Sequence, residues 1–219
     1  MEMPSLLLAL ASLIPVILLG LGMFFLARLL ARLDRNSAHL ASLGFSLITL
    51  GGLLHTLWKF TLAITELNIA VLNHSLLILT APGFVLMAWA LWNTFHGGPS
   101  GTPVWVVPVI VIVVGGGAAA INALSKGGQR WFYILLGMTM LAQTAMALLL
   151  AWQAWRRGLA LIAVLFIFYL LVVSVQAGVL PLQFPSHALQ WLKQSSDTFV
   201  GGAFAYATWQ LEQCITKRS

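Results

Sequence analysis

Long runs of apolar residues, separated by short segments that hold charged residues, glycine or proline, dominate the sequence. Most runs reach about 20 residues, the length that an α-helix needs to cross the hydrocarbon core of a bilayer. The pattern therefore predicts an all-α polytopic membrane protein, a bundle of seven transmembrane helices in a single domain over residues 1–219. The predicted helices cover residues 5–31, 38–64, 75–95, 104–123, 131–154, 158–180 and 188–213.

The composition supports this fold class. Hydrophobic residues make up 60% of the 219-residue chain, and charged residues make up 7%. A soluble domain usually contains about 25% charged residues, so this chain lacks the polar surface that a soluble fold of its size requires. The single cysteine excludes an internal disulfide. The lipid bilayer is therefore the first partner that we expect.

Basic residues lie in the loops and at the ends of the predicted helices. The formal charge is +6, but no basic run is longer than Arg156-Arg157, so nucleic acid is not an expected partner. In membrane proteins, lysine and arginine are in excess on the cytoplasmic side. Seven basic residues fall on the side of the C-terminus and four on the side of the N-terminus. We therefore expect a protein of the cell membrane with its N-terminus outside and its C-terminus in the cytoplasm. The seven are Arg28, Arg32, Arg35, Arg156, Arg157, Lys217 and Arg218, and the four are Lys59, Lys126, Arg130 and Lys193.

Two short segments, LLGLGM at 18–23 and LLGMTM at 135–140, resemble each other. Each precedes an arginine-bearing loop and then a predicted helix with a polar residue well inside it, His55 in the first case and Gln176 in the second. This spacing predicts a 3+1+3 pseudo-repeat, in which the helix over 104–123 joins two parallel three-helix units. Some small transporters are built from parallel repeats of this kind.

Ionisable residues concentrate in the segment HTLWKFTLAITELNIAVLNHS, residues 55–75. If the helix over 38–64 continues to Glu66, Lys59 lies about 40° and Glu66 about 20° from His55 around the helix axis, so the three share one face. A charge deep in hydrocarbon costs at least about 2.5–3.5 kcal/mol. We therefore expect this face to look into the bundle or into a water-filled cavity.

A second polar stripe follows the helix predicted over 188–213. Its residues recur at spacings of three and four, which places them on one broad helical face. Under the expected topology, the face of His55 and the polar outer end of this stripe lie in the extracytoplasmic half of the bundle, where Gln176 and His74 also fall. The stripe consists of His187, Gln190, Gln194, Asp197, Gly201, Ala205 and Thr208.

These positions predict a ligand-binding site that is reached from the extracytoplasmic side. The sequence contains no HExxH, GxSxG, P-loop, GxGxxG or CxxCH motif, so we assign no catalytic residue. A polar interior without a catalytic motif favours binding and translocation of a small polar solute or ion, with His55 and Asp197 coupling occupancy to protonation. The expected ligand-binding residues are His55, Lys59, Gln176 and Asp197, and further lining candidates are Glu66, His74, His187 and Gln194.

Other interpretations of the same residues remain open. His55, with His74 or His187, could hold a metal or haem in a membrane redox subunit, although haem is not favoured and no cofactor is assigned. An intramembrane enzyme acting on lipid would use His55 as a general base, but no nucleophile stands out. A subunit that only assembles with another membrane protein, or with copies of itself, also fits. Lys59 and Lys193 could be anchors that extend to the membrane surface, and Lys193 could pair with Asp197.

Overall fold

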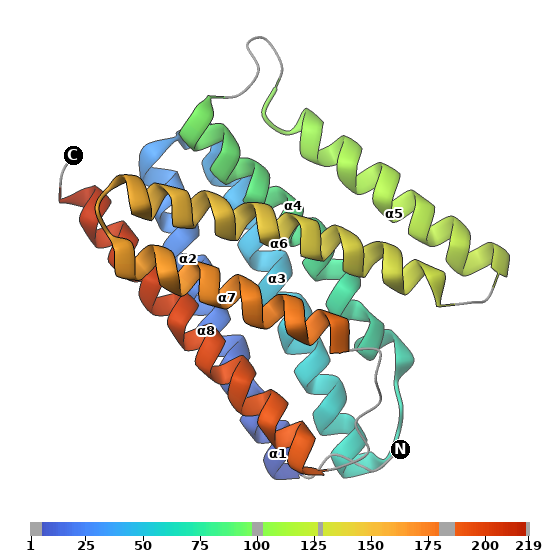
Figure 1. Ribbon diagram of the computed structural model, residues 1–219. Coiled ribbons are helices and arrows are strands. Elements are labelled where there is room, and N and C mark those ends of the chain that lie inside the picture. The colour runs from blue at the N-terminus through green and yellow to red at the C-terminus, as the bar shows by residue number, and fades with distance from the viewer. Residues whose placement is uncertain (1–5, 98–102, 127–128, 180–186, 218–219) are drawn as a thin grey trace.

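The computed structural model describes residues 6–97, 103–126, 129–179 and 187–217, and every regular element in these ranges is an α-helix (Figure 1). Helices α1 and α2 form one nearly continuous segment, interrupted at Ser12. The prediction of an all-α fold is therefore confirmed. The helices are α1 (Leu6–Ala11), α2 (Leu13–Leu33), α3 (Arg35–Thr65), α4 (Ala70–His96), α5 (Val106–Lys126), α6 (Arg130–Arg156), α7 (Ala160–Val179) and α8 (His187–Thr216).

Six of the described segments are long and apolar enough to cross a bilayer, which confirms the multi-pass membrane class. Helix α8 is 30 residues long but is not among the six, because polar residues such as Lys193, Asp197 and Glu212 interrupt its apolar sequence. The seventh crossing therefore stays a prediction. The six segments are Leu6–Leu33, Arg35–Thr65, Ala70–His96, Val106–Ser125, Arg130–Arg156 and Ala160–Gly178.

Several helix boundaries differ from the sequence prediction: α4, for example, begins at Ala70 and not at residue 75. Both boundaries of α3 have a local explanation. Helix α3 begins at Arg35 because the side chain of Asp34 accepts hydrogen bonds from the backbone amides of Asn36 (2.9 Å) and Ser37 (3.3 Å). It ends at Thr65, because Glu66 has a left-handed backbone with a φ of 59°. The assumed continuation of this helix through Glu66 is therefore wrong. Most of the segment between the helices predicted over 158–180 and 188–213 lies outside the described residues.

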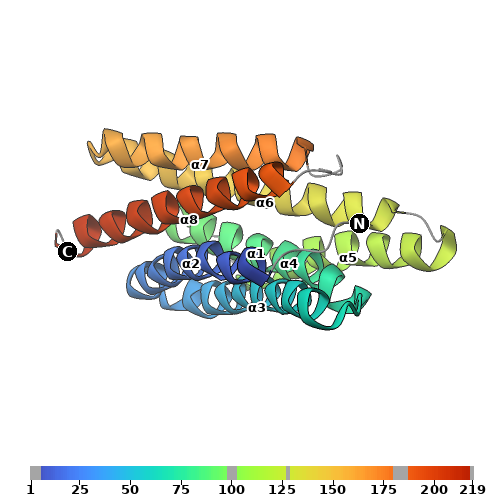
Figure 2. The ribbon, with the colours of Figure 1, turned by 90° about the horizontal axis from the view of Figure 1, so that it is seen from below.

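Six helices form a closed ring in the order α2, α3, α4, α6, α7 and α8, each packed against the next, and α8 closes the ring against α2 (Figures 1 and 2). Helix α5 lies outside the ring, where it packs on α6 and α4. Seen from below, α6 and α7 lie on one side of the molecule, and α2 and α3 lie on the other (Figure 2). The ring thus has an interior that α5 does not reach.

Helices α2 and α8 run side by side in the same direction. The side-chain amide of Gln194 donates to the backbone carbonyl of Ala11 near the start of both helices, at 2.9 Å. Near the end of both helices, Arg28 donates to Glu212. These contacts are about 26 Å apart along α2, at 1.5 Å per residue. The ring therefore has an N-terminal end, where α2 and α8 start, and a C-terminal end, where they finish.

The apolar core fills the ring toward its C-terminal end. There the helices approach closely: a Cβ atom on Gly44 of α3 would lie 2.8 Å from the carbonyl oxygen of Gly83 on α4. Small residues at helix contacts allow this proximity. The fully buried apolar side chains in this cluster include Met23, Leu26, Leu30, Met87, Leu91, Met146, Leu150, Phe204 and Leu211.

Candidate functional site

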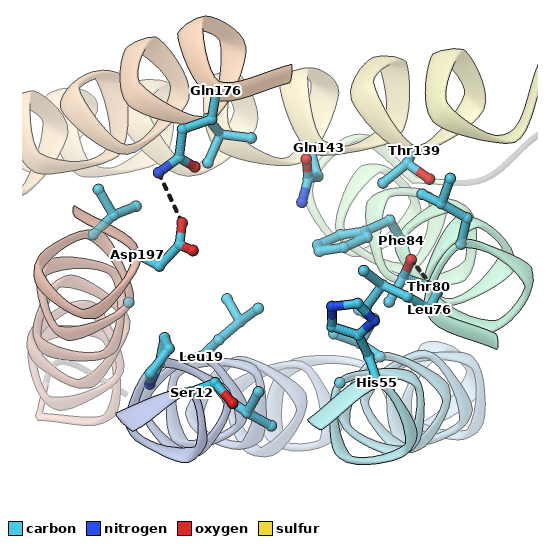
Figure 3. Close-up of a pocket in the computed structure, with 18 of the residues that line it drawn as sticks. Ser12, Leu19, His55, Leu76, Thr80, Phe84, Thr139, Gln143, Gln176 and Asp197 are labelled. Carbon is cyan, nitrogen blue, oxygen red and sulfur yellow. Dashed lines mark hydrogen bonds between the residues drawn. The ribbon is translucent and has the colours of Figure 1, made fainter. Parts of the chain in front are cut away.

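An open cavity of about 310 Å³ lies inside the ring, toward its N-terminal end (Figure 3). All six ring helices contribute side chains to its wall, whereas α5 contributes none. Because α2, α4, α6 and α8 run in one direction and α3 and α7 run in the other, the wall combines the first halves of the former with the last halves of the latter. Residues far apart in the sequence therefore face one space.

Helix α3 supplies His55 and Lys59, which lie one turn apart on the same face and both line the cavity. The imidazole of His55 points into the cavity (Figure 3), and it stacks on Trp58 with ring centroids 5.3 Å apart. Its Nδ1 atom is buried and has no hydrogen-bond partner within the described part of the chain. His55 therefore presents a free polar atom inside an apolar helix, which is costly unless a ligand or water binds it.

Gln176 of α7 and Asp197 of α8 meet on the other side of the cavity (Figure 3). The Gln176 side-chain amide donates to Oδ1 of Asp197 at 2.7 Å and to Oγ of Ser196 at 3.3 Å. The sequence also allowed Asp197 to pair with Lys193, one turn earlier. The described residues show no such ion pair, since Asp197 instead accepts from a neutral amide.

Lys59 and Lys193 also line the cavity, from the two helices that flank α2. Neither ammonium group lies within 4.0 Å of a carboxylate oxygen among residues 6–97, 103–126, 129–179 and 187–217. The cavity wall thus contains two lysines that the protein itself leaves without an ion pair.

Of the further lining candidates, Gln194 does line the cavity, although its amide is bound to the backbone of Ala11. Glu66 is exposed just after the end of α3 and is not part of the wall. His74 is also exposed, and its ring packs edge-on against Trp131 at 4.8 Å. His187 begins α8, but its side chain lies outside the described residues.

The histidines proposed as metal or haem ligands are therefore not brought together where they are described. His55 faces the cavity, and His74 lies outside its wall. Within the described ranges, no group of three or more histidine, cysteine, aspartate or glutamate side chains could hold a metal ion. No observation on these residues favours the redox alternative.

Sequence reasoning missed the deeper polar part of the cavity. Gln143 of α6 and Tyr169 of α7 are buried, and the Gln143 amide donates to the tyrosine hydroxyl at 3.4 Å. Thr80 and Thr139 also line the wall, but each hydroxyl donates to the carbonyl four residues earlier in its own helix. Gln143, in the middle of an apolar run, was the one signal in the sequence. The two threonines gave none, because threonine is common in such helices.

A second polar cluster, also missed, lies at the C-terminal end of the ring. The carboxylate of Glu212 is 1% exposed; it accepts a hydrogen bond from Nε of Arg28 at 2.5 Å and forms an ion pair with the guanidinium of Arg32 at 3.1 Å. This cluster joins α8 to α2. It could not be read from spacing, because its partners are 184 residues apart in the chain.

Asp34 anchors a neighbouring network between α2 and α3. Its carboxylate accepts from the hydroxyl of Ser37 and from the side-chain amide of Asn93 on α4. Partial burial acts to raise the pKa of Asp34, but the hydrogen bonds from Ser37, Asn36 and Asn93 outweigh this effect and hold the pKa below its usual value. Asp34 is therefore a structural carboxylate that caps α3.

A comparison with protein-family models, with curated proteins and with solved structures found no match to this chain. The function must therefore be inferred from the cavity itself. The chain is a multi-pass helical membrane protein by the length and hydropathy of its helices. Its ring encloses a cavity with charged and amide side chains in the wall.

Proposed function

We propose that the protein binds a small polar solute or ion in the cavity of the ring and translocates it across the membrane. The observation that carries this proposal is that polar side chains from separate helices line one open space inside a mainly apolar bundle. Ionisable residues within membrane helices are costly, and they typically mark substrate or ion pathways. His55, Lys59, Gln176 and Asp197 are the proposed binding residues.

The order of the helices supports a translocation mechanism with two three-helix units. A pseudo-two-fold operation that carries α2, α3 and α4 onto α6, α7 and α8 also carries the contact between α4 and α6 onto the contact between α8 and α2. Both contacts exist, and α5 lies outside as the joining helix. Rocking of one unit against the other around a central site is a common route to alternating access.

The two proposed proton-coupling residues belong to different units. His55 is on α3 of the first unit, and Asp197 is on α8 of the second. A solute that contacts both would favour closure of the units around it, because a ligand shifts an equilibrium toward the state it binds more tightly. We propose that protonation of His55 or Asp197 alters this contact and so links occupancy to pH.

The proposed topology places the open end of the cavity outside the cell. The C-terminal end of the ring carries Arg28, Arg32 and Arg156, the kind of basic residue that accumulates on the cytoplasmic side. The tightly packed core also lies at that end. The protein is thus proposed to be open outward and closed inward.

Osmotic swelling of proteoliposomes tests the proposal without knowledge of the solute. Vesicles with the full-length protein would be mixed with acetate, lactate, glycine, glycerol, choline or sodium salts, and solute entry would be followed by stopped-flow light scattering. We expect faster entry of at least one solute than in protein-free vesicles. The double substitution His55→Ala and Asp197→Ala should reduce that entry to the protein-free rate, because it removes a polar group from each unit.

A matched control is His39→Ala, since His39 is an exposed histidine on the same helix as His55 but at the other end of the ring. This variant should keep the wild-type rate. Wild-type swelling in the double variant, or no accelerated solute in a panel of all charge types, would contradict the proposed function.

A further inference from the structure

The charged residues of the cavity do not balance one another. Lys59 and Lys193 contribute two positive charges, and Asp197 contributes the one described carboxylate in the wall. Both lysines lack an ion pair, and Asp197 is bound to the neutral amide of Gln176. The wall therefore carries a net positive charge even when His55 is neutral.

An unbalanced lysine at this position is a reason to expect a counter-charge from outside the chain. Lys59 is only partly exposed and lies on α3 within a membrane-length helix. A buried or partly buried ion is stabilised by an opposite charge that is held close to it in a low-dielectric site. An anionic ligand between Lys59 and Lys193 would supply this charge, whereas a cationic ligand would add to the repulsion.

The rest of the wall is suited to an organic body. Leu19, Leu76 and Phe84 face the cavity, beside the polar side chain of Gln143 (Figure 3). The volume of about 310 Å³ lies near the lower limit of roughly 300–1,000 Å³ for small-molecule sites. Such sites typically combine apolar walls with a few polar groups that fix the orientation of the ligand. A small organic molecule fits this description better than an inorganic ion alone.

We infer that the solute is a small organic anion of the carboxylate type. Its charged group lies between Lys59 and Lys193, and its apolar body lies toward Leu19, Leu76 and Phe84. The imidazole of His55 also faces this space. This inference rests on the proposed function and names the substrate class of the same cavity.

Three probes of nearly equal shape and different charge test the inference: benzoate, benzamide and benzamidine. Each would be titrated into the detergent-purified full-length protein, with binding followed by calorimetry and by the shift in melting temperature. We expect saturable binding of benzoate and much weaker binding of benzamide and benzamidine. The affinity should depend on the charge of the probe, because the three probes share the same ring and have nearly the same size.

Substitutions in the cavity sharpen the test. Lys59→Gln should weaken benzoate binding by about tenfold or more, because it removes a charge-assisted hydrogen bond. Lys193→Gln should weaken it less, because Lys193 is exposed. Lys59→Arg keeps the charge and should retain most of the affinity, and Asp197→Asn should raise the affinity, because it removes the negative charge that the described wall carries. The matched control is Lys217→Gln, an exposed lysine just beyond the other end of α8.

Several outcomes would overturn the inference. One is binding of benzamidine or benzamide as tight as that of benzoate, and another is the absence of binding by all three probes. A third is loss of benzoate binding in the Asp197→Asn protein together with its retention in the Lys59→Gln protein. None of these results decides whether the protein translocates a solute. The swelling experiment tests that function separately, because it responds to solutes of any charge. Conversely, benzoate binding without accelerated entry of any solute would reject translocation and keep the anion site.

Discussion

Charged residues are paired at one end of the helix ring and unpaired at the other. At the C-terminal end, Glu212 is buried and forms ion pairs with Arg28 and Arg32. At the N-terminal end, Lys59 and Lys193 line a cavity and lack a carboxylate partner among the described residues. Charges that the protein pairs itself join helices together, whereas charges that it leaves unpaired beside a cavity are available to a ligand.

The packing of side chains also differs between the two ends of the ring. The largest cluster of fully buried side chains is at the C-terminal end, and the open cavity of about 310 Å³ is at the other. One end is therefore built mainly for stability. At the N-terminal end, the helices make fewer contacts and leave a cavity between them. Functional sites often have lower stability for this kind of reason.

The largest expected difference between the ends comes from two leucines on α6. Leu150 is 0% exposed in the core, whereas Leu136 is partly exposed in the cavity wall. Leu150→Ala should lower the free energy of unfolding by about 2–5 kcal/mol, because it leaves an unfilled space among packed side chains. Leu136→Ala only widens an existing cavity and should cost much less. Denaturant titrations in detergent would measure the free energy of unfolding of both variants. Equal losses of stability would contradict the distinction between the ends.

A smaller difference is expected between the two acidic residues of α8. Glu212→Gln removes the carboxylate that Arg28 and Arg32 share. It should lower the melting temperature by more than the roughly 2–4 °C that 1 kcal/mol produces in a chain of this length. Asp197→Asn should leave the melting temperature nearly unchanged, because an amide can keep a hydrogen bond to Gln176. A larger loss in the Asp197→Asn protein would mean that Asp197 is structural.

The smallest expected effect concerns Asp34 and depends on pH. Asp34→Ala should cost about 1 kcal/mol through loss of the α3 cap. Because hydrogen bonds hold the pKa of the folded carboxyl below its usual value of 3.8, the contribution of Asp34 is complete above about pH 4. It is lost as the pH falls through the lower pKa of the folded state. Melting temperatures of wild type and of Asp34→Asn, measured from pH 6 to pH 3, should therefore converge at the acid end. A gap that stays constant over this range would show that the charge of Asp34 is unimportant.

Local patterns in the sequence predicted the helices because each apolar run decides its own structure. They also indicated His55 and Asp197, since a polar residue inside such a run has few structural uses. Glu66 was expected on the face of His55, but the left-handed turn at that residue ended the helix first. The backbone conformation of a loop residue is not encoded in helical periodicity.

Contacts between distant helices could not be predicted in the same way. The pair of Arg28 and Glu212, and the hydrogen bond between Gln143 and Tyr169, each depend on which helices are neighbours in the ring. That order is set by side-chain fit over the whole bundle, and many orders are compatible with the same seven apolar runs. The convergence of Lys59 with Lys193 is a result of this order.

Helix α5 packs mainly on α6 and α4, yet it determines the direction of the helices that follow it. Helices α2, α3 and α4 traverse the molecule three times, an odd number, so a helix joined directly after α4 runs opposite to α2. One additional crossing restores the original direction. This is why α8 can run parallel to α2 and bring Gln194 to Ala11 and Glu212 to Arg28. Helix α5 lies outside the ring, but it reverses the chain once more and so allows α6, α7 and α8 to enter the ring in the observed directions.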